Sequence, residues 1–258
     1  MKTTIKKLVL SCAATATLLA ANASATTLKI GVAAEPYPPF SIKQSSGQWS
    51  GFEIDLINSI CKEIKAQCQI TEMSWDGIIP ALNSKKIDVI FNSMSITPER
   101  EKVIAFSVPY YYTPAEFVGP KGVKLNTTPA GLKGKIIGVQ ASTTHADFAK
   151  KYYEKTSTIK YYNTQDELNA DVAAGRVDVM LEDTVAAIDF LKSKDGANLE
   201  SKGFAPKDPI FGPGIGAGLR KSDVALKKQF DDAIHNIQTS GTFNAIQKKY
   251  FKIDISAK

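Results

Sequence analysis

Short apolar stretches alternate with longer amphipathic ones along most of the chain. Between Glu53 and Lys65 the apolar side chains recur every three or four residues, which is typical of a helix that covers a sheet. The same reasoning predicts strands at 28–32, 87–91, 135–139 and 177–181, and helices at 53–65, 75–84, 166–174, 223–239 and 243–250. Strands that alternate with helices predict an α/β fold with mostly parallel sheets, covered by helices on both faces.

Part of this pattern occurs twice. Residues 74–90 and 164–180 align at an offset of 90, and both segments contain an apolar-Asp-apolar triplet near their end. A second echo joins Ile30-Gly31-Val32 to Ile137-Gly138-Val139, in the same order along the chain. The two echoes together predict two lobes of similar topology.

The predicted lobes are not continuous in sequence. We expect a first lobe formed by residues 26–113 and 211–258, with residues 114–210 as the second lobe. The chain would cross between them at 112–118 and return through the glycine-rich segment 211–219. Two crossings close together form a hinge, which allows the lobes to close around a ligand.

The first 25 residues have the features of an export signal. Three lysines precede an apolar and small-residue stretch from Leu8 to Ala21, and Ala23-Ser24-Ala25 provides a small-x-small cleavage site. We therefore predict a signal peptide over residues 1–25 and a periplasmic location. A lipoprotein with Cys12 as the modified residue, or an uncleaved anchor helix, are the alternatives.

Composition narrows the choice of partners. The chain is 43% hydrophobic and 22% charged, as expected of a globular protein, and no run reaches the ~20 apolar residues of a membrane-spanning helix. The formal net charge of +6 falls to +3 once the leader is removed, because the leader contains three lysines and no acid. This charge is too small to indicate a nucleic acid or an anionic membrane as the partner.

Two cysteines, Cys61 and Cys68, follow the predicted leader. A pair in an oxidising compartment favours a disulfide. Along one continuous helix their Cα atoms would be about 10.5 Å apart, whereas a disulfide needs about 4.4–6.8 Å, so the bond requires the helix to end between them. Two buried thiols are the alternative. The two histidines, His145 and His235, read as exposed polar residues, and the sequence predicts neither a metal site nor a cofactor.

Polar residues follow the predicted strands, where ligands of open parallel sheets bind. The loops at these strand ends contain Asn92, Ser93, Ser95, Ser142, Thr143, Thr144 and Asp183. Arg100 follows closely and could hold a carboxylate through both of its terminal nitrogens, while Asp183 in the other lobe could accept hydrogen bonds from an ammonium. Such a pair across a cleft would fit a zwitterionic α-amino acid, although Arg100 could instead be a solvated charge beside Glu99 or Glu101.

Four further residues are candidates for contacts with the side chain of the ligand. Tyr37 and Trp75 could sandwich a planar cation, and Glu35 or Glu53 could provide the opposite charge. The alternatives are core packing for the two rings and surface positions for the two acids. No nucleophile with a neighbouring base is visible, so we do not expect an enzyme.

The sequence resembles the periplasmic polar-amino-acid-binding proteins of ABC transporters, especially the branch that binds histidine, lysine, arginine and ornithine. The resemblance covers nearly all of the chain after the leader. It is carried by YPPF at 37–40, GFEIDL at 51–56, DGIIPAL at 76–82, KKID at 85–88, SITPER at 95–100, AFSVPYY at 105–111, LKGKIIGVQAST at 132–143, GRVDVMLED at 175–183, GLRK at 218–221 and GTFNAIQKKYF at 241–251.

The resemblance implies a type II periplasmic binding protein: a monomer, without cofactor, that captures a free L-amino acid, most readily arginine, and delivers it to a membrane permease. Arg100 is then the clamp of the α-carboxylate, aided by N–H groups near Ser95 and Thr143, while Asp183 and Ser93 hold the α-ammonium.

Some positions depart from the family pattern. Asn92 and Thr144 differ from the common Ser and Gln, Glu35 lies in a segment one residue longer than in close relatives, and Glu53 is acidic in branches of different specificity. An alternative within the same fold is a dehydratase of prephenate or arogenate, with an acidic residue as proton donor. A sensing domain of a membrane receptor is a third interpretation.

Overall fold

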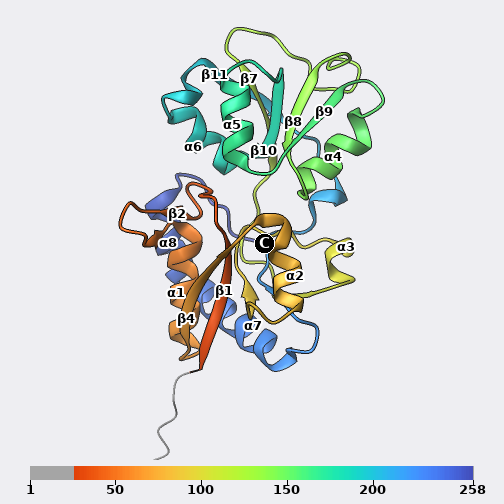
Figure 1. Ribbon diagram of the computed structural model, residues 1–258. Helices are drawn as coiled ribbons and strands as arrows, with labels where there is room; N and C mark the ends of the chain where they lie inside the picture. Colours follow the sequence, from red (N-terminus) through yellow and green to blue (C-terminus); the bar gives the residue numbers. More distant parts are fainter. Residues whose placement is uncertain (1–25, 258) are drawn as a thin grey trace, which may run out of the picture.

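The computed structural model describes residues 26–257 and contains two lobes, each built on a five-stranded sheet (Figure 1). In lobe 1 the strand order is β4-β1-β5-β12-β6. These strands are β1 (Thr27–Ala33), β4 (Gln67–Met73), β5 (Val89–Ile90), β6 (Ala105–Phe106) and β12 (Gly218–Leu219), and a small separate sheet pairs β2 (Ile42–Lys43) with β3 (Trp49–Ser50).

Lobe 2 repeats this arrangement, with strand order β9-β8-β10-β7-β11 when the sheet is read from the matching edge. Its strands are β7 (Ala115–Pro120), β8 (Ile136–Gln140), β9 (Thr158–Tyr162), β10 (Val179–Asp183) and β11 (Leu199–Phe204). In each sheet the first three strands are parallel and the fourth is antiparallel to the third. The prediction of two similar lobes with mostly parallel sheets is confirmed.

The sequence echoes have a physical cause in this topology. The Asp88 carboxylate accepts the backbone N–H of Lys29 at 3.0 Å, and the Asp178 carboxylate accepts that of Ile136 at 2.8 Å. In each lobe the aspartate therefore fixes the start of its own strand against the neighbouring parallel strand. A carboxylate that accepts a backbone N–H is a strong, charge-assisted contact, which explains why both copies contain the same residue at this place.

Helices cover both sheets. Lobe 1 contains α1 (Phe52–Glu63), α2 (Ile78–Asn83), α3 (Pro98–Glu101), α7 (Val224–Thr239) and α8 (Thr242–Tyr250), and lobe 2 contains α4 (Thr144–Tyr153), α5 (Gln165–Ala173) and α6 (Thr184–Lys192). Three short 3₁₀ turns add η1 (Trp75–Gly77), η2 (Asp195–Asn198) and η3 (Pro209–Phe211). The sequence did not predict α4 or α6, and the predicted helix 75–84 is a 3₁₀ turn followed by α2.

The disulfide between Cys61 and Cys68 is present, with Cα atoms 6.2 Å apart. As predicted, the helix ends between the two cysteines: α1 stops at Glu63, Lys65 adopts a positive φ of 56°, and β4 begins at Gln67. No helix within residues 26–257 is long and apolar enough to cross a membrane. The predicted signal peptide over residues 1–25 lies outside the described residues.

The two crossings between the lobes lie side by side. Ile215 donates its backbone N–H to the carbonyl of Tyr111 at 2.8 Å, and Tyr110 donates its own to the carbonyl of Ile215 at 2.9 Å. Two adjacent connections of this kind permit rotation of one lobe against the other. The lobe boundaries at 113/114 and 210/211 remain a prediction, although β7 begins at Ala115.

A glycine in the returning segment is required by its neighbours. Gly212 has a φ of 74°, and a Cβ at this position would lie 1.8 Å from the carbonyl oxygen of Ile96. Gly122 has the same φ of 74°, with open space around it. Gly212 combines its φ with a ψ of −179°, a region essentially restricted to glycine, so Gly122 is a reference for the positive φ alone.

We expect Gly212→Ala to lower the thermal midpoint much more than Gly122→Ala does. Both changes introduce strain from a positive φ, about 1–3 kcal/mol, but only the first also places a Cβ against the carbonyl of Ile96 and forces the hinge apart. Differential scanning calorimetry of both variants measures the difference. Equal midpoints would show that the contact with Ile96 relaxes without cost.

Candidate functional site

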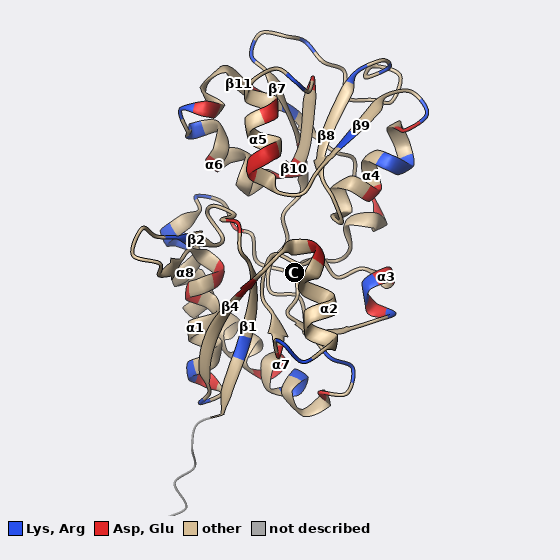
Figure 2. Cartoon of the chain, in the orientation of Figure 1, with Lys and Arg blue, Asp and Glu red and all other residues tan. Residues whose placement is uncertain are grey.

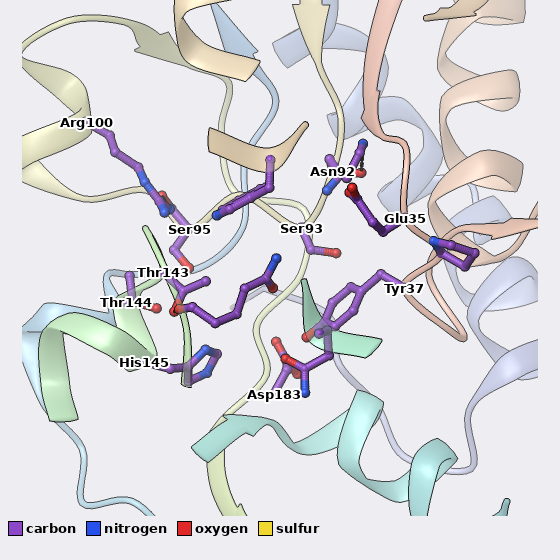
Figure 3. A pocket seen from close by; sticks show the side chains of 15 residues that line it. Glu35, Tyr37, Asn92, Ser93, Ser95, Arg100, Thr143, Thr144, His145 and Asp183 are labelled. Atoms are coloured by element: carbon purple, nitrogen blue, oxygen red, sulfur yellow. Dashed lines mark hydrogen bonds between the residues drawn. The ribbon is translucent and has the colours of Figure 1, made fainter. Parts of the chain in front are cut away.

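A cavity lies where the two lobes meet, at the carboxyl ends of β1, β5, β8 and β10 (Figure 3). Its volume is about 60 Å³ in this arrangement of the lobes. Ten of the twelve residues predicted for ligand binding line it, namely Glu35, Tyr37, Trp75, Asn92, Ser93, Ser95, Arg100, Thr143, Thr144 and Asp183. The two others, Glu53 and Ser142, do not.

Arg100 reaches the cavity from α3 of lobe 1. The hydroxyl of Thr97 caps this helix by accepting the backbone N–H of Arg100 at 3.2 Å, and Nη1 of Arg100 donates to the carbonyl of Ser95 at 2.9 Å. Nη2 donates across the lobes to the carbonyl of Ser142 at 3.0 Å, which also accepts Nε1 of Trp75 at 3.3 Å. Ser142 therefore takes part through its backbone oxygen, which joins the two lobes.

The guanidinium of Arg100 is available for an anion. Within residues 26–257 no carboxylate forms an ion pair with it, and burial lowers its pKa to about 10, so that it stays charged at neutral pH. Opposite it begins α4, capped by Thr143, whose hydroxyl accepts the backbone N–H of Ala146 at 3.1 Å. A cationic side chain and a helix N-terminus thus face the same part of the cavity, and both favour a negative group.

Asp183 ends β10 of lobe 2 and caps α6, so the predicted loop at this place is in fact a strand end and a helix start. Its carboxylate accepts the hydroxyl of Thr113 at 2.6 Å and the backbone N–H of Val185 at 3.4 Å. Burial, opposed by the two hydrogen bonds and aided by the negative charge of Glu53, raises the pKa of Asp183 to about 7. An ammonium beside this carboxylate would favour its ionised form.

Glu53 stands behind the cavity and is only 1% exposed. It accepts the backbone N–H and the hydroxyl of Ser93 at 2.8 and 2.9 Å, and the hydroxyl of Tyr110 at 2.7 Å. The hydroxyl of Tyr111 donates to that of Ser93 at 2.8 Å. Glu53 therefore positions Ser93 and does not line the cavity itself, while its contact with the ligand stays a prediction. Burial raises the pKa of Glu53, and these hydrogen bonds oppose the rise.

The remaining predicted residues line the side of the cavity that faces lobe 1. Tyr37 and Glu35 come from the segment after β1, Trp75 comes from η1, and Asn92 follows β5. The amide oxygen of Asn92 accepts the backbone N–H of Ala33 at 2.9 Å, which holds the ends of β1 and β5 together. Figure 3 shows Tyr37 reaching toward Asp183, with Glu35 on the lobe 1 side of the ring.

The sequence missed several residues of the cavity, namely Ala33, Pro36, Gln140, His145 and Gln165. The most informative is His145, which was expected to be an exposed polar residue. It occupies the first turn of α4, with its ring 5.9 Å from that of Phe211, and points into the cavity (Figure 3). Burial, together with the charge of Arg100, lowers the pKa of His145 to about 4. The imidazole is therefore neutral at neutral pH.

The arrangement suits a compact zwitterion. A guanidinium from lobe 1 and a buried carboxylate from lobe 2 approach the cavity from opposite sides (Figure 3). Within residues 26–257 no group of three or more His, Cys, Asp or Glu side chains is placed to hold a metal ion. The site therefore places a positive side chain on lobe 1 and a negative side chain on lobe 2, and the two lobes can rotate relative to one another.

Comparison with known proteins gives a consistent result. The family model of bacterial extracellular solute-binding proteins, family 3, matches residues 28–253. The L-arginine-binding protein of Pseudomonas aeruginosa is 41% identical over 236 residues, which cover 88% of this chain and 89% of the relative. The histidine-binding periplasmic protein of Salmonella typhimurium is 38% identical over 257 residues, covering 97% of this chain and 99% of the relative.

A solved structure agrees with these sequence matches. An ancestral arginine-binding protein bound to arginine superimposes with a TM-score of 0.80 at 32% identity, covering 87% of this chain and 98% of the other. The relatives named here are binding proteins.

Proposed function

Because the chain belongs to the bacterial extracellular solute-binding proteins of family 3, we propose that it is a periplasmic receptor that captures one free amino acid by closure of its lobes and delivers it to the permease of an ABC importer. The observation that carries this proposal is the opposition of Arg100 and Asp183 across the cavity. Arg100 and the start of α4 hold the α-carboxylate, and Asp183 holds the α-ammonium.

The ligand is cationic, with arginine preferred over lysine, ornithine and histidine. Tyr37 and Trp75 offer ring faces to a planar guanidinium. Burial raises the pKa of Asp166 in the other lobe, and the negative charge of Glu35 adds to this rise. A cationic side chain beside Glu35 would offset this repulsion between the lobes. The arginine- and histidine-binding relatives support the same preference.

Closure is the signal to the permease. In the present arrangement the carbonyl of Ser142 in lobe 2 already accepts hydrogen bonds from Arg100 and Trp75 in lobe 1. A ligand carboxylate would add a partner that both lobes share, and so favour the closed form. We propose that the protein acts as a monomer, is exported by its N-terminal signal, and does no chemistry on its ligand. The dehydratase alternative has no supporting observation in this site.

A thermal-shift screen across the standard amino acids, ornithine and citrulline tests this function, because a ligand that binds only the folded state raises the melting temperature. We expect arginine to give the largest shift, followed by the other cationic amino acids. Glu35→Gln should reduce the shifts of the cationic ligands and leave that of glutamine unchanged. No shift with any amino acid would reject the function, and equal losses for arginine and glutamine in Glu35→Gln would reject the role of Glu35.

A further inference from the structure

A second and larger cavity lies between the lobes, on the other side of Tyr37. Its volume is about 380 Å³, and it is bounded by Pro36–Pro38 of lobe 1 and by α5, α6 and the end of β10 in lobe 2. Pro36, Tyr37 and Gln165 belong to the walls of both cavities, so the two are neighbours. None of the contacts assigned to the amino acid explains this second space.

Its walls are strongly acidic. Asp166 on α5, Glu182 on β10, Asp189 on α6 and Asp195 on η2 all line it, and no lysine or arginine among residues 26–257 does. Figure 2 shows the acidic residues of α5 in red. Four carboxyl groups in a wall that contains no lysine or arginine of the described residues favour a positive occupant.

Glu182 is the second, independent observation. Its residue is 1% exposed, and both of its carboxylate oxygens are buried without a hydrogen-bond partner. Its neighbour across the sheet is another acid, Glu116, whose carboxylate accepts the hydroxyl of Ser201. An unpaired buried carboxyl group costs free energy that a hydrogen-bond donor would recover. Burial raises the pKa of Glu182, and the charges of Asp183 and Glu116 raise it further.

We propose that this second cavity binds a small organic cation, such as an aliphatic diamine, with Glu182 and Asp166 as its principal partners. The ligand class lacks an α-carboxylate, because the cavity wall has no basic side chain to hold one. The ring of Tyr37 borders the space and offers an apolar wall for the methylene chain. This cation is distinct from the amino acid held between Arg100 and Asp183.

The position of the cavity implies coupling between the two ligands. Its walls belong to both lobes, so an occupant stabilises their closed arrangement. In this arrangement the charge of Glu35 adds to burial in raising the pKa of Asp166, and a cation nearby would offset the repulsion between the two acids. Two ligands that favour the same conformation raise each other's affinity by the same factor. The amino acid therefore binds more tightly when the second cavity is filled.

Titration calorimetry of arginine binding, with putrescine as the probe of the second cavity, tests the proposal. This first experiment rests on the proposed function, because it requires that arginine binds. We expect the Kd of arginine to fall about fivefold or more at saturating putrescine, relative to sodium chloride at equal ionic strength. Glu182→Gln and Asp166→Asn should remove the effect, so that putrescine no longer changes the Kd of arginine in either variant. Asp232→Asn, an exposed acid on α7, is the matched control and should keep the effect.

A competing cation would give the opposite sign. If putrescine entered the arginine cavity, the Kd of arginine would rise, and this result or an unchanged Kd would overturn the proposal. A second arm needs no arginine: putrescine alone should raise the melting temperature of wild type and Asp232→Asn, and not of Asp166→Asn, whose exposed side chain is tolerant of change. Equal shifts in all three proteins would also overturn it, whether or not arginine binds.

Discussion

Arg100→Ala is expected to abolish binding of every amino acid at the concentrations that saturate the wild type. The guanidinium is the only cationic side chain lining the cavity in the described part of the chain, since His145 is neutral there. Removing one partner of a buried ion pair costs about 3–5 kcal/mol, which weakens binding roughly 100- to 4000-fold. Titration calorimetry with arginine, lysine and glutamine measures the loss.

Two further variants separate charge from geometry. Arg100→Lys keeps the charge but not the planar fork, so we expect it to recover only part of the affinity. Arg176→Ala removes an exposed arginine that pairs with Asp171 in lobe 2, and should bind as the wild type does. If Arg100→Ala bound all three amino acids normally, the carboxylate would be held elsewhere and the proposed orientation of the ligand would be wrong.

The sequence predicted most strands and helices of the two lobes, because these elements bury apolar side chains at regular spacing along the chain. The parallel strands and the long helices α1, α7 and α8 each present a continuous buried stripe. The repeat was visible because the same contact recurs in each lobe, with Asp88 and Asp178 binding the start of a neighbouring strand. Burial of one face of an element and pairing of neighbouring strands both constrain which residue type occurs at each position, so both can be recognised in the sequence.

The helices α4 and α6 were missed for a different reason. Both begin directly at polar residues that form the cavity, and these residues read as the loops that follow strands. Thr143 and Asp183 are in fact helix caps, whose side chains accept the backbone N–H groups of Ala146 and Val185. A capping residue ahead of an apolar stretch was the available signal.

Side-chain direction accounts for the other differences. Glu53 and Glu35 are both acids near the predicted cavity, but Glu53 lies on α1 and turns toward Ser93 and Tyr110. His145 was placed on the surface because α4 was not predicted, so nothing indicated which way its first turn would face. Whether a polar residue lines a cavity or supports it from behind depends on tertiary packing, which spacing along the chain does not encode.

Asp183→Asn is expected to weaken amino-acid binding and to remove most of its dependence on pH. Truncating the charge that faces a buried ammonium costs about 2–5 kcal/mol, or roughly a 30- to 4000-fold rise in Kd. In the empty wild type the carboxyl has a pKa of about 7. The ammonium requires its ionised form, so below that pH a proton must leave before the ligand binds.

The affinity of the wild type should therefore rise about tenfold per pH unit up to pH 7 and then level off. The stability of the empty protein should change in the opposite direction. Because the folded-state pKa of Asp183 is raised from 3.8 to about 7, its contribution is complete below pH 3.8 and is lost as the pH rises through 7. Asp183→Asn should remove the contribution of this residue to the pH dependence of affinity and to the pH dependence of stability. Asp232→Asn should change neither dependence.

Calorimetry between about pH 5 and pH 9, two units on either side of the shifted pKa, measures the first curve, and melting temperatures of the empty protein measure the second. The two slopes have opposite signs for one reason: the buried carboxylate lacks a positive partner until the ligand supplies it. An affinity that stays constant across this range in the wild type would show that Asp183 is ionised before the ligand arrives. In that case binding would release no proton from Asp183, and the expected link between protonation of this residue and affinity would be wrong, while the pairing of Asp183 with the ammonium would still stand.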